Sequence, residues 1–166
     1  MQNQTLRTAL KRGFLFFSAT VLLLTLQFLF VLFTSNTLDI MSPLGYLFFF
    51  ASCLSHAACL ALPPYLIYML IACTGCVRIA RVVHFVLVAL LVLLVFLDAQ
   101  VYAIYRFHIN GFVLNMVFGP GAGEIFTFDT WLYLKEVSLF LLLLGVVPIG
   151  FRVGFGANAA RPTWRP

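Results

Sequence analysis

Long apolar runs alternate with short polar stretches along almost the whole chain. The runs cover residues 13–34, 44–72, 82–104 and 131–151. A helix needs about 20 predominantly apolar residues to cross the hydrocarbon core of a bilayer, and each run reaches that length. The pattern therefore predicts four transmembrane helices, which together form a membrane domain over residues 13–155.

The second run contains Pro63 and Pro64 near its middle. Proline removes a helical hydrogen bond and kinks the helix, which a membrane helix tolerates when neighbours satisfy the freed carbonyls. We expect one kinked, tilted helix here. Two half-length arms would invert the side of the membrane on which every later loop lies.

The segment between the third and fourth runs, residues 105–130, is the sizeable exterior region. Within it, Phe112–Phe118 is apolar but too short to span, and a Gly-Pro-Gly turn signal follows it. This pattern predicts an interfacial amphipathic segment, with a re-entrant piece packed on protein as the alternative. The predicted fold is an all-α membrane protein, with four transmembrane helices and this segment between helices 3 and 4.

Composition points to lipid as the solvent for most of the surface. The chain is 63% hydrophobic and 9% charged, whereas a soluble domain carries about 25% charged residues. The net charge of +5 comes from basic residues scattered at the ends of the runs. Nucleic-acid binding needs a basic patch or stripe, so we expect no nucleic-acid partner.

Basic residues near the run ends predict the topology. Lys and Arg number three before the first run, none in the next connection, two between the second and third runs, and three after the last run. Around the connection between the third and fourth runs, Arg106 and Lys135 are offset by three acidic residues, Glu124, Asp129 and Glu136. Basic-rich connections stay in the cytoplasm. We therefore expect a cytoplasmic N-terminus (residues 1–12), four crossings, and a cytoplasmic tail (residues 156–166). The first apolar run exceeds the about 7–15 residues of a cleaved signal peptide, so it is interpreted as an uncleaved anchor.

Cysteine, histidine and polar residues within the apolar runs raise alternative functions, namely a thiol oxidoreductase, a haem protein and a small transporter. Cys73 and Cys76 have a redox-type spacing, but a membrane thiol oxidoreductase needs its pairs on the oxidising face, and these two adjoin Arg78 and Arg81. The three histidines provide no pair at matching depth for haem. A small transporter would need a polar path, for which Gln27, His56, Asp98 and Gln100 are the available residues. We expect no cofactor, no metal site and no catalytic residue.

The polar stretch after the third run carries the candidate site. Asp98 lies near the outer end of an otherwise apolar helix, where an ionisable group is costly and usually paired. Tyr102 and Arg106 follow at i+4 and i+8, so the spacing places Arg106 within reach of Asp98. A structural ion pair with interfacial tyrosines is one interpretation. A polar cluster that touches lipid headgroups or docks an exterior domain is the other, with His108 and Asn110 included.

The run LDAQVYAIYRFHINGFVLNMVFGPGAGEIFTFDTW at residues 97–131 resembles the N-terminal membrane domain of bacterial inner-membrane sulfatase-like proteins. These belong to the alkaline-phosphatase superfamily and include a regulator of lipopolysaccharide synthesis. The stretch SxxSHAxxLAL around His56 is also similar. The residues that match the family pattern are Asp98, Tyr102, Arg106, Phe107, His108 and Asn110.

The resemblance implies a membrane-anchoring and lipid-sensing or domain-docking role in envelope lipid or lipopolysaccharide metabolism. Family members typically have a fifth helix and a large periplasmic domain, and neither is present in these 166 residues. The family's hydrolase or transferase activity is therefore not carried over, and we expect a truncated product or a free-standing membrane module that is not an enzyme. The expected partners are membrane lipids or lipopolysaccharide, and another membrane or periplasmic protein.

Overall fold

The computed structural model describes residues 2–34, 42–120 and 130–156, and within these ranges the regular structure is entirely helical. The helices are α1 (Gln2–Thr34), α2 (Pro43–Cys73), α3 (Val77–Tyr105), α4 (Gly111–Phe118) and α6 (Thr130–Phe155). In the described part of the chain, α1, α2, α3 and α6 are each long and apolar enough to cross a membrane. The all-α membrane fold with four spanning helices is confirmed.

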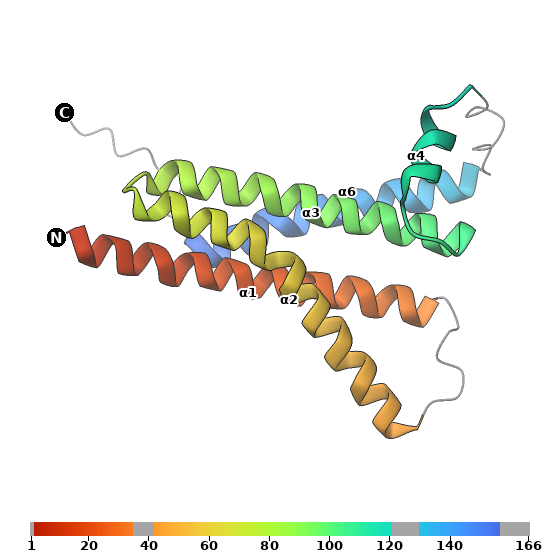
Figure 1. Ribbon diagram of the computed structural model, residues 1–166, viewed down its shortest axis with the longest axis horizontal. Helices are drawn as coiled ribbons and strands as arrows, with labels where there is room; N and C mark the ends of the chain where they lie inside the picture. Colours follow the sequence, from red (N-terminus) through yellow and green to blue (C-terminus); the bar gives the residue numbers. More distant parts are fainter. Residues whose placement is uncertain (1, 35–41, 121–129, 157–166) are drawn as a thin grey trace.

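The four long helices alternate in direction, so that the start of α1 and the end of α6 lie at the same end of the bundle (Figure 1). The C-terminal half of α2 lies at this end too, because the Tyr68 hydroxyl donates a hydrogen bond of 2.7 Å to the carbonyl of Ala9 in α1. Basic residues occupy this end, which we call the basic end. They are Arg7, Lys11, Arg12, Arg78, Arg81 and Arg152.

Buried aromatic side chains hold the helices together near the basic end. The ring of His84 in α3 lies 4.9 Å from the ring of Phe16 in α1 and 5.0 Å from that of Tyr68 in α2, measured between centroids. Phe155 in α6 lies 5.7 Å from Phe16 and from Tyr68. All four side chains are buried. One cluster thus joins all four spanning helices.

Helix α2 is continuous through Pro63 and Pro64, which confirms one helix rather than two arms. The N-terminus of α2 is capped, because the Ser42 hydroxyl accepts a hydrogen bond from the Gly45 N–H, and Pro43 occupies the first helical position. Its first half projects away from the other helices, whereas its second half packs in the bundle (Figure 1). The first half is therefore covered by little of its own chain.

The helices extend beyond the apolar runs. Helix α1 begins at Gln2 and includes most of the N-terminal stretch that we expected to lie outside the membrane domain, α3 begins at Val77, and α6 continues to Phe155. The reason is that an apolar run marks only the part in hydrocarbon, while long basic side chains let a helix continue through the headgroup region. Residues 121–129 of the exterior segment and 157–166 of the tail lie outside the described residues.

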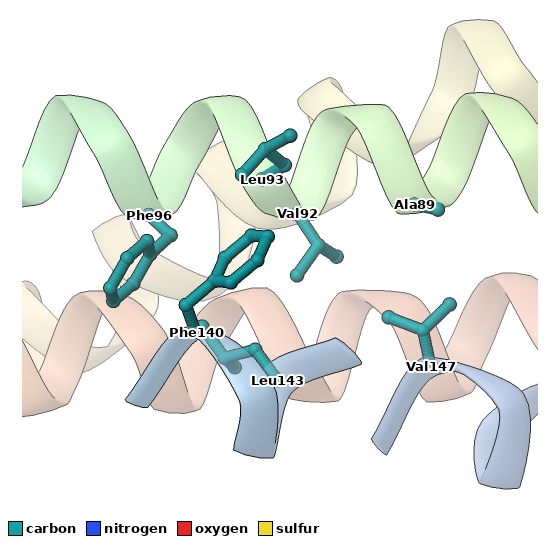
Figure 2. Close-up of a pocket in the computed structure, with 7 residues that line it drawn as sticks. All are labelled: Ala89, Val92, Leu93, Phe96, Phe140, Leu143 and Val147. Atoms are coloured by element: carbon teal, nitrogen blue, oxygen red, sulfur yellow. The ribbon is translucent and has the colours of Figure 1, made fainter. Parts of the chain in front are cut away.

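Helices α3 and α6 leave a small apolar cavity of about 10 Å³ between them. Figure 2 shows its lining: Ala89, Val92, Leu93, Phe96, Phe140, Leu143 and Val147. None of these side chains carries a polar group that could orient a ligand. The cavity is therefore a packing gap and not a candidate site.

Candidate functional site at the corner between helices α3 and α4

Asp98 fixes the chain where it turns from α3 toward α4. One carboxylate oxygen, Oδ2, lies 2.7 Å from Nδ1 of His108. The other, Oδ1, accepts a hydrogen bond of 2.7 Å from the backbone N–H of Ile109. Hydrogen bonds to a charged carboxylate are among the stronger ones in proteins. A single side chain thus ties the connection back to the helix that precedes it.

The turn itself is made at Arg106. Its backbone is in the left-handed region, with φ of 62° and ψ of 21°, and its N–H donates to the carbonyl of Tyr102 over 2.9 Å. Helices commonly end in this conformation, but the residue is usually glycine or asparagine. For other residues the left-handed region costs about 1–2 kcal/mol. The corner therefore holds an arginine in a backbone position that is unfavourable for it.

Arg106 is not the partner of Asp98, although the spacing placed it within reach. The spacing i, i+4, i+8 assumes that the helix continues through Arg106, whereas α3 ends at Tyr105. His108 takes the place at Asp98 because the left-handed turn brings the following residues back over the helix end. Nothing in the sequence pattern indicated this pairing across ten residues.

Tyr102 and Asn110 complete the corner. The ring of Tyr102 stacks on that of His108, with 4.9 Å between centroids and 21° between planes. The Asn110 side-chain oxygen accepts hydrogen bonds from the backbone N–H groups of Phe112 and Val113, at 3.0 and 3.1 Å, and so caps the start of α4. Four of the five predicted site residues thus build the corner and position the fifth, Arg106.

The corner exposes a cation beside apolar surface. The side chain of Arg106 is exposed and has no ion-pair partner within residues 2–34, 42–120 and 130–156. The His108 side chain is 72% exposed, and Asp98 beside it is 35% exposed. On α4, Phe112 and Phe118 are exposed as well. An exposed guanidinium, followed along the chain by a short helix with exposed aromatic rings, suits the boundary between phosphate headgroups and acyl chains.

The other candidate residues lie elsewhere. Cys73 ends α2, Cys76 precedes α3, and both are exposed, free thiols at the basic end. His56 is exposed on α2 and its ring meets that of Phe28 at 6.0 Å, whereas His84 is buried in the aromatic cluster. Gln27 is buried and donates to the carbonyl of Val92 over 3.4 Å. Among the described residues, no three His, Cys, Asp or Glu side chains gather where a metal ion could bind.

Comparison with known proteins yields one family. The model of a family described as a domain of unknown function, DUF3413, matches residues 2–152, which include α1, α2, α3, the corner and all but the last three residues of α6. No curated protein and no solved structure matches the chain. The match extends over well more than half of the sequence, and the chain therefore belongs to the DUF3413 family.

Proposed function

We propose that this chain is a membrane module of the bacterial inner membrane whose corner between α3 and α4 binds the phosphate of an anionic lipid. The observation that carries the proposal is Arg106, an exposed guanidinium without an ion-pair partner in the described ranges, at a corner that Asp98, Tyr102 and His108 build. Arginine presents a planar fork of donors that matches phosphate oxygens. Its place at the end of α3, a spanning helix, fits the headgroup level of the bilayer.

The resemblance of residues 97–131 to sulfatase-like proteins gives the proposed context, which is envelope lipid or lipopolysaccharide metabolism. In that context the module acts by anchoring and by sensing lipid, and it performs no catalytic step itself. Docking of an exterior protein domain on the same corner is the second candidate role. It is favoured by the exposed rings of Phe112 and Phe118 on α4, the helix that follows the corner.

The lipid proposal is tested by titrating short-chain phosphatidylglycerol, and separately lipid A, into the protein in an uncharged detergent. The amide resonances of Ile109 and Phe112 report on the corner alone. Arg106→Gly removes the cation but suits the left-handed backbone, so the fold is kept. Because hydrogen bonds to charged groups contribute about 1.5–3 kcal/mol, we expect affinity to fall about tenfold or more.

The matched control is Arg106→Lys, which keeps the charge without the fork and should lose less affinity. The response to the two lipids separates a phospholipid ligand from lipopolysaccharide. Unchanged titrations of both lipids in Arg106→Gly would refute lipid binding at this corner. If neither lipid shifts the Ile109 and Phe112 resonances of the unaltered protein, the docking role becomes the better proposal.

We further propose that the basic end faces the cytoplasm. Six basic residues gather there, and basic ends of membrane helices are retained inside. In the sequence, every acidic residue falls in the connections at the opposite end or in the adjoining two turns of helix. These residues are Asp39, Asp98, Glu124, Asp129 and Glu136.

The native thiols Cys73 and Cys76 test this orientation, because both are exposed at the basic end. We expect a membrane-impermeant maleimide to label them in inside-out vesicles and to leave them unlabelled in right-side-out vesicles. Asn115→Cys, on the exposed side of α4, introduced with serine at positions 73 and 76, should show the opposite pattern. Labelling of Cys73 and Cys76 from outside would reverse the assigned topology.

A further inference from the structure

The first half of α2 carries a polar face that is exposed in the described structure, although the ring of His56, at one edge of this face, contacts Phe28 of α1. Ser52, Ser55, His56 and Cys59 are all exposed. At 3.6 residues per turn they fall within a face about 100° wide. The residues that α2 buries against the bundle in the same region, Cys53, Ala57 and Ala61, lie on a different face. We call the exposed set the α2 polar face.

This face lies at the depth where polar groups are least tolerated. His56 is close to the midpoint of the 31-residue helix, and α2 is one of the four spanning helices. Ionisable groups in hydrocarbon are costly and almost always face protein or a water-filled cavity. Within residues 2–34, 42–120 and 130–156, no group forms a hydrogen bond with the side chain of Ser52, Ser55 or His56, so these polar side chains are open to a partner surface.

The two prolines add to the demand for hydrogen-bond donors. Pro63 has no N–H to offer to the carbonyl of Cys59, and Pro64 has none for that of Leu60. Pro63 is exposed and follows Cys59 by one turn, on the same side of the helix as the α2 polar face. Freed carbonyls in a membrane helix are satisfied by side chains of neighbouring helices or by water. A donor that approaches this face would therefore find an acceptor as well.

We propose that a second copy of this chain covers the α2 polar face, with the two α2 helices packed in parallel about a two-fold axis along the membrane normal. Serine hydroxyls and the histidine ring each donate and accept, so the face is complementary to itself. Helix α2 contains no charged side chain, and two identical faces therefore meet without repulsion. Parallel packing follows because both copies have the same orientation in the membrane.

The spacing of small residues supports the same arrangement. Gly45, Ser52 and Cys59 recur every seven residues along this face, the repeat of a left-handed helix pair. Small residues at membrane-helix contacts let the backbones approach closely and bring Ser and His into hydrogen-bonding reach. The start of α2 diverges from α1, α3 and α6 (Figure 1), so there is room beside it for a partner helix.

Cys59 makes the pairing directly testable, because residues on a two-fold axis meet their own copies. Native membranes containing the protein with Cys53→Ser, Cys73→Ser and Cys76→Ser would be oxidised with copper phenanthroline. We expect a cross-linked species of twice the mass of the uncross-linked protein, formed through Cys59. Replacing Ser52 and His56 by leucine, with Cys59 retained, should lower the cross-linked fraction several-fold.

Leu54→Cys, in the same background with Cys59→Ser, is the control. Leu54 is exposed, lies about 7.5 Å from position 59 along the helix axis, and is on the far side of the helix from Ser52. Equal cross-linking through positions 54 and 59 would indicate random collision and overturn the proposal. So would the absence of a Cys59 cross-link, or a product of any other mass, which would assign the face to a different membrane protein.

Discussion

Replacing Gly154 by alanine is expected to lower the free energy of unfolding by about 1–3 kcal/mol, the usual cost of overpacking a closely packed site. A Cβ atom at this position would lie 2.7 Å from Cβ of Phe16 and 2.9 Å from its Cα and N. Two of these atoms belong to the backbone of α1 and cannot move aside as the end of a flexible side chain can. Helix α6 would have to shift away from α1, and the aromatic cluster around Phe16 and His84 would lose contacts.

Gly145 provides the matched control, because it lies on the same helix and a Cβ there would meet nothing within 4 Å. Gly145→Ala should leave stability unchanged or raise it, since alanine favours a helix over glycine by about 0.5–1 kcal/mol. The measurement is unfolding in mixed detergent micelles followed by circular dichroism. Equal midpoints for the Gly154 and Gly145 variants would show that α1 and α6 do not approach each other this closely.

The close approach at Gly154 belongs to the tightly packed, basic end of the bundle, which differs from the less enclosed opposite end. Near the basic end, the ring of Tyr68 packs against those of His84 and Phe155, and its hydroxyl donates a hydrogen bond to the carbonyl of Ala9. Toward the other end, α2 diverges and α4 leaves the direction of the long helices (Figure 1). The tightly packed end therefore serves as the scaffold, while the surfaces that offer binding groups, namely the corner and the α2 polar face, are on the less enclosed part.

The spanning helices were predictable because each rests on a run of apolar residues that water would not tolerate. The short helix α4 was predictable as well, since an apolar segment lies between the polar residues ending at Asn110 and a Gly-Pro turn, and Asn110 itself caps the helix. The change in direction along α2 (Figure 1) agrees with the kink expected from Pro63 and Pro64. In each case a local property of the sequence determines the local structure.

The contacts of Asp98 were not predictable in the same way. They depend on Arg106 taking a left-handed backbone conformation, which residue type does not indicate and which redirects the chain so that His108 and Ile109 reach the carboxylate. The convergence of Phe16, Tyr68, His84 and Phe155 likewise depends on how four helices are rotated against one another. Apolar runs without a sharp polar face leave that rotation undetermined.

Asp98→Ala is expected to release the corner while the bundle stays folded. The substitution removes the acceptor of the Ile109 N–H and the partner of His108 in one step. Losing a hydrogen bond to a charged group costs about 1.5–3 kcal/mol, and each 1.4 kcal/mol is about tenfold in an equilibrium constant. Hydrogen exchange at the Ile109 amide should therefore accelerate by about tenfold to a hundredfold, whereas exchange in the middle of α3 should be unchanged.

Asp98→Asn separates the two contacts, because the amide keeps an oxygen for the Ile109 N–H but loses the carboxylate oxygen that pairs with His108. We expect its exchange rate at Ile109 to lie between those of the unaltered protein and Asp98→Ala. The same order should hold for lipid affinity if Arg106 acts from a corner that Asp98 positions. An Ile109 amide that exchanges equally slowly in all three proteins would mean that Asp98 does not hold the corner, and that Arg106 is positioned by the left-handed turn alone.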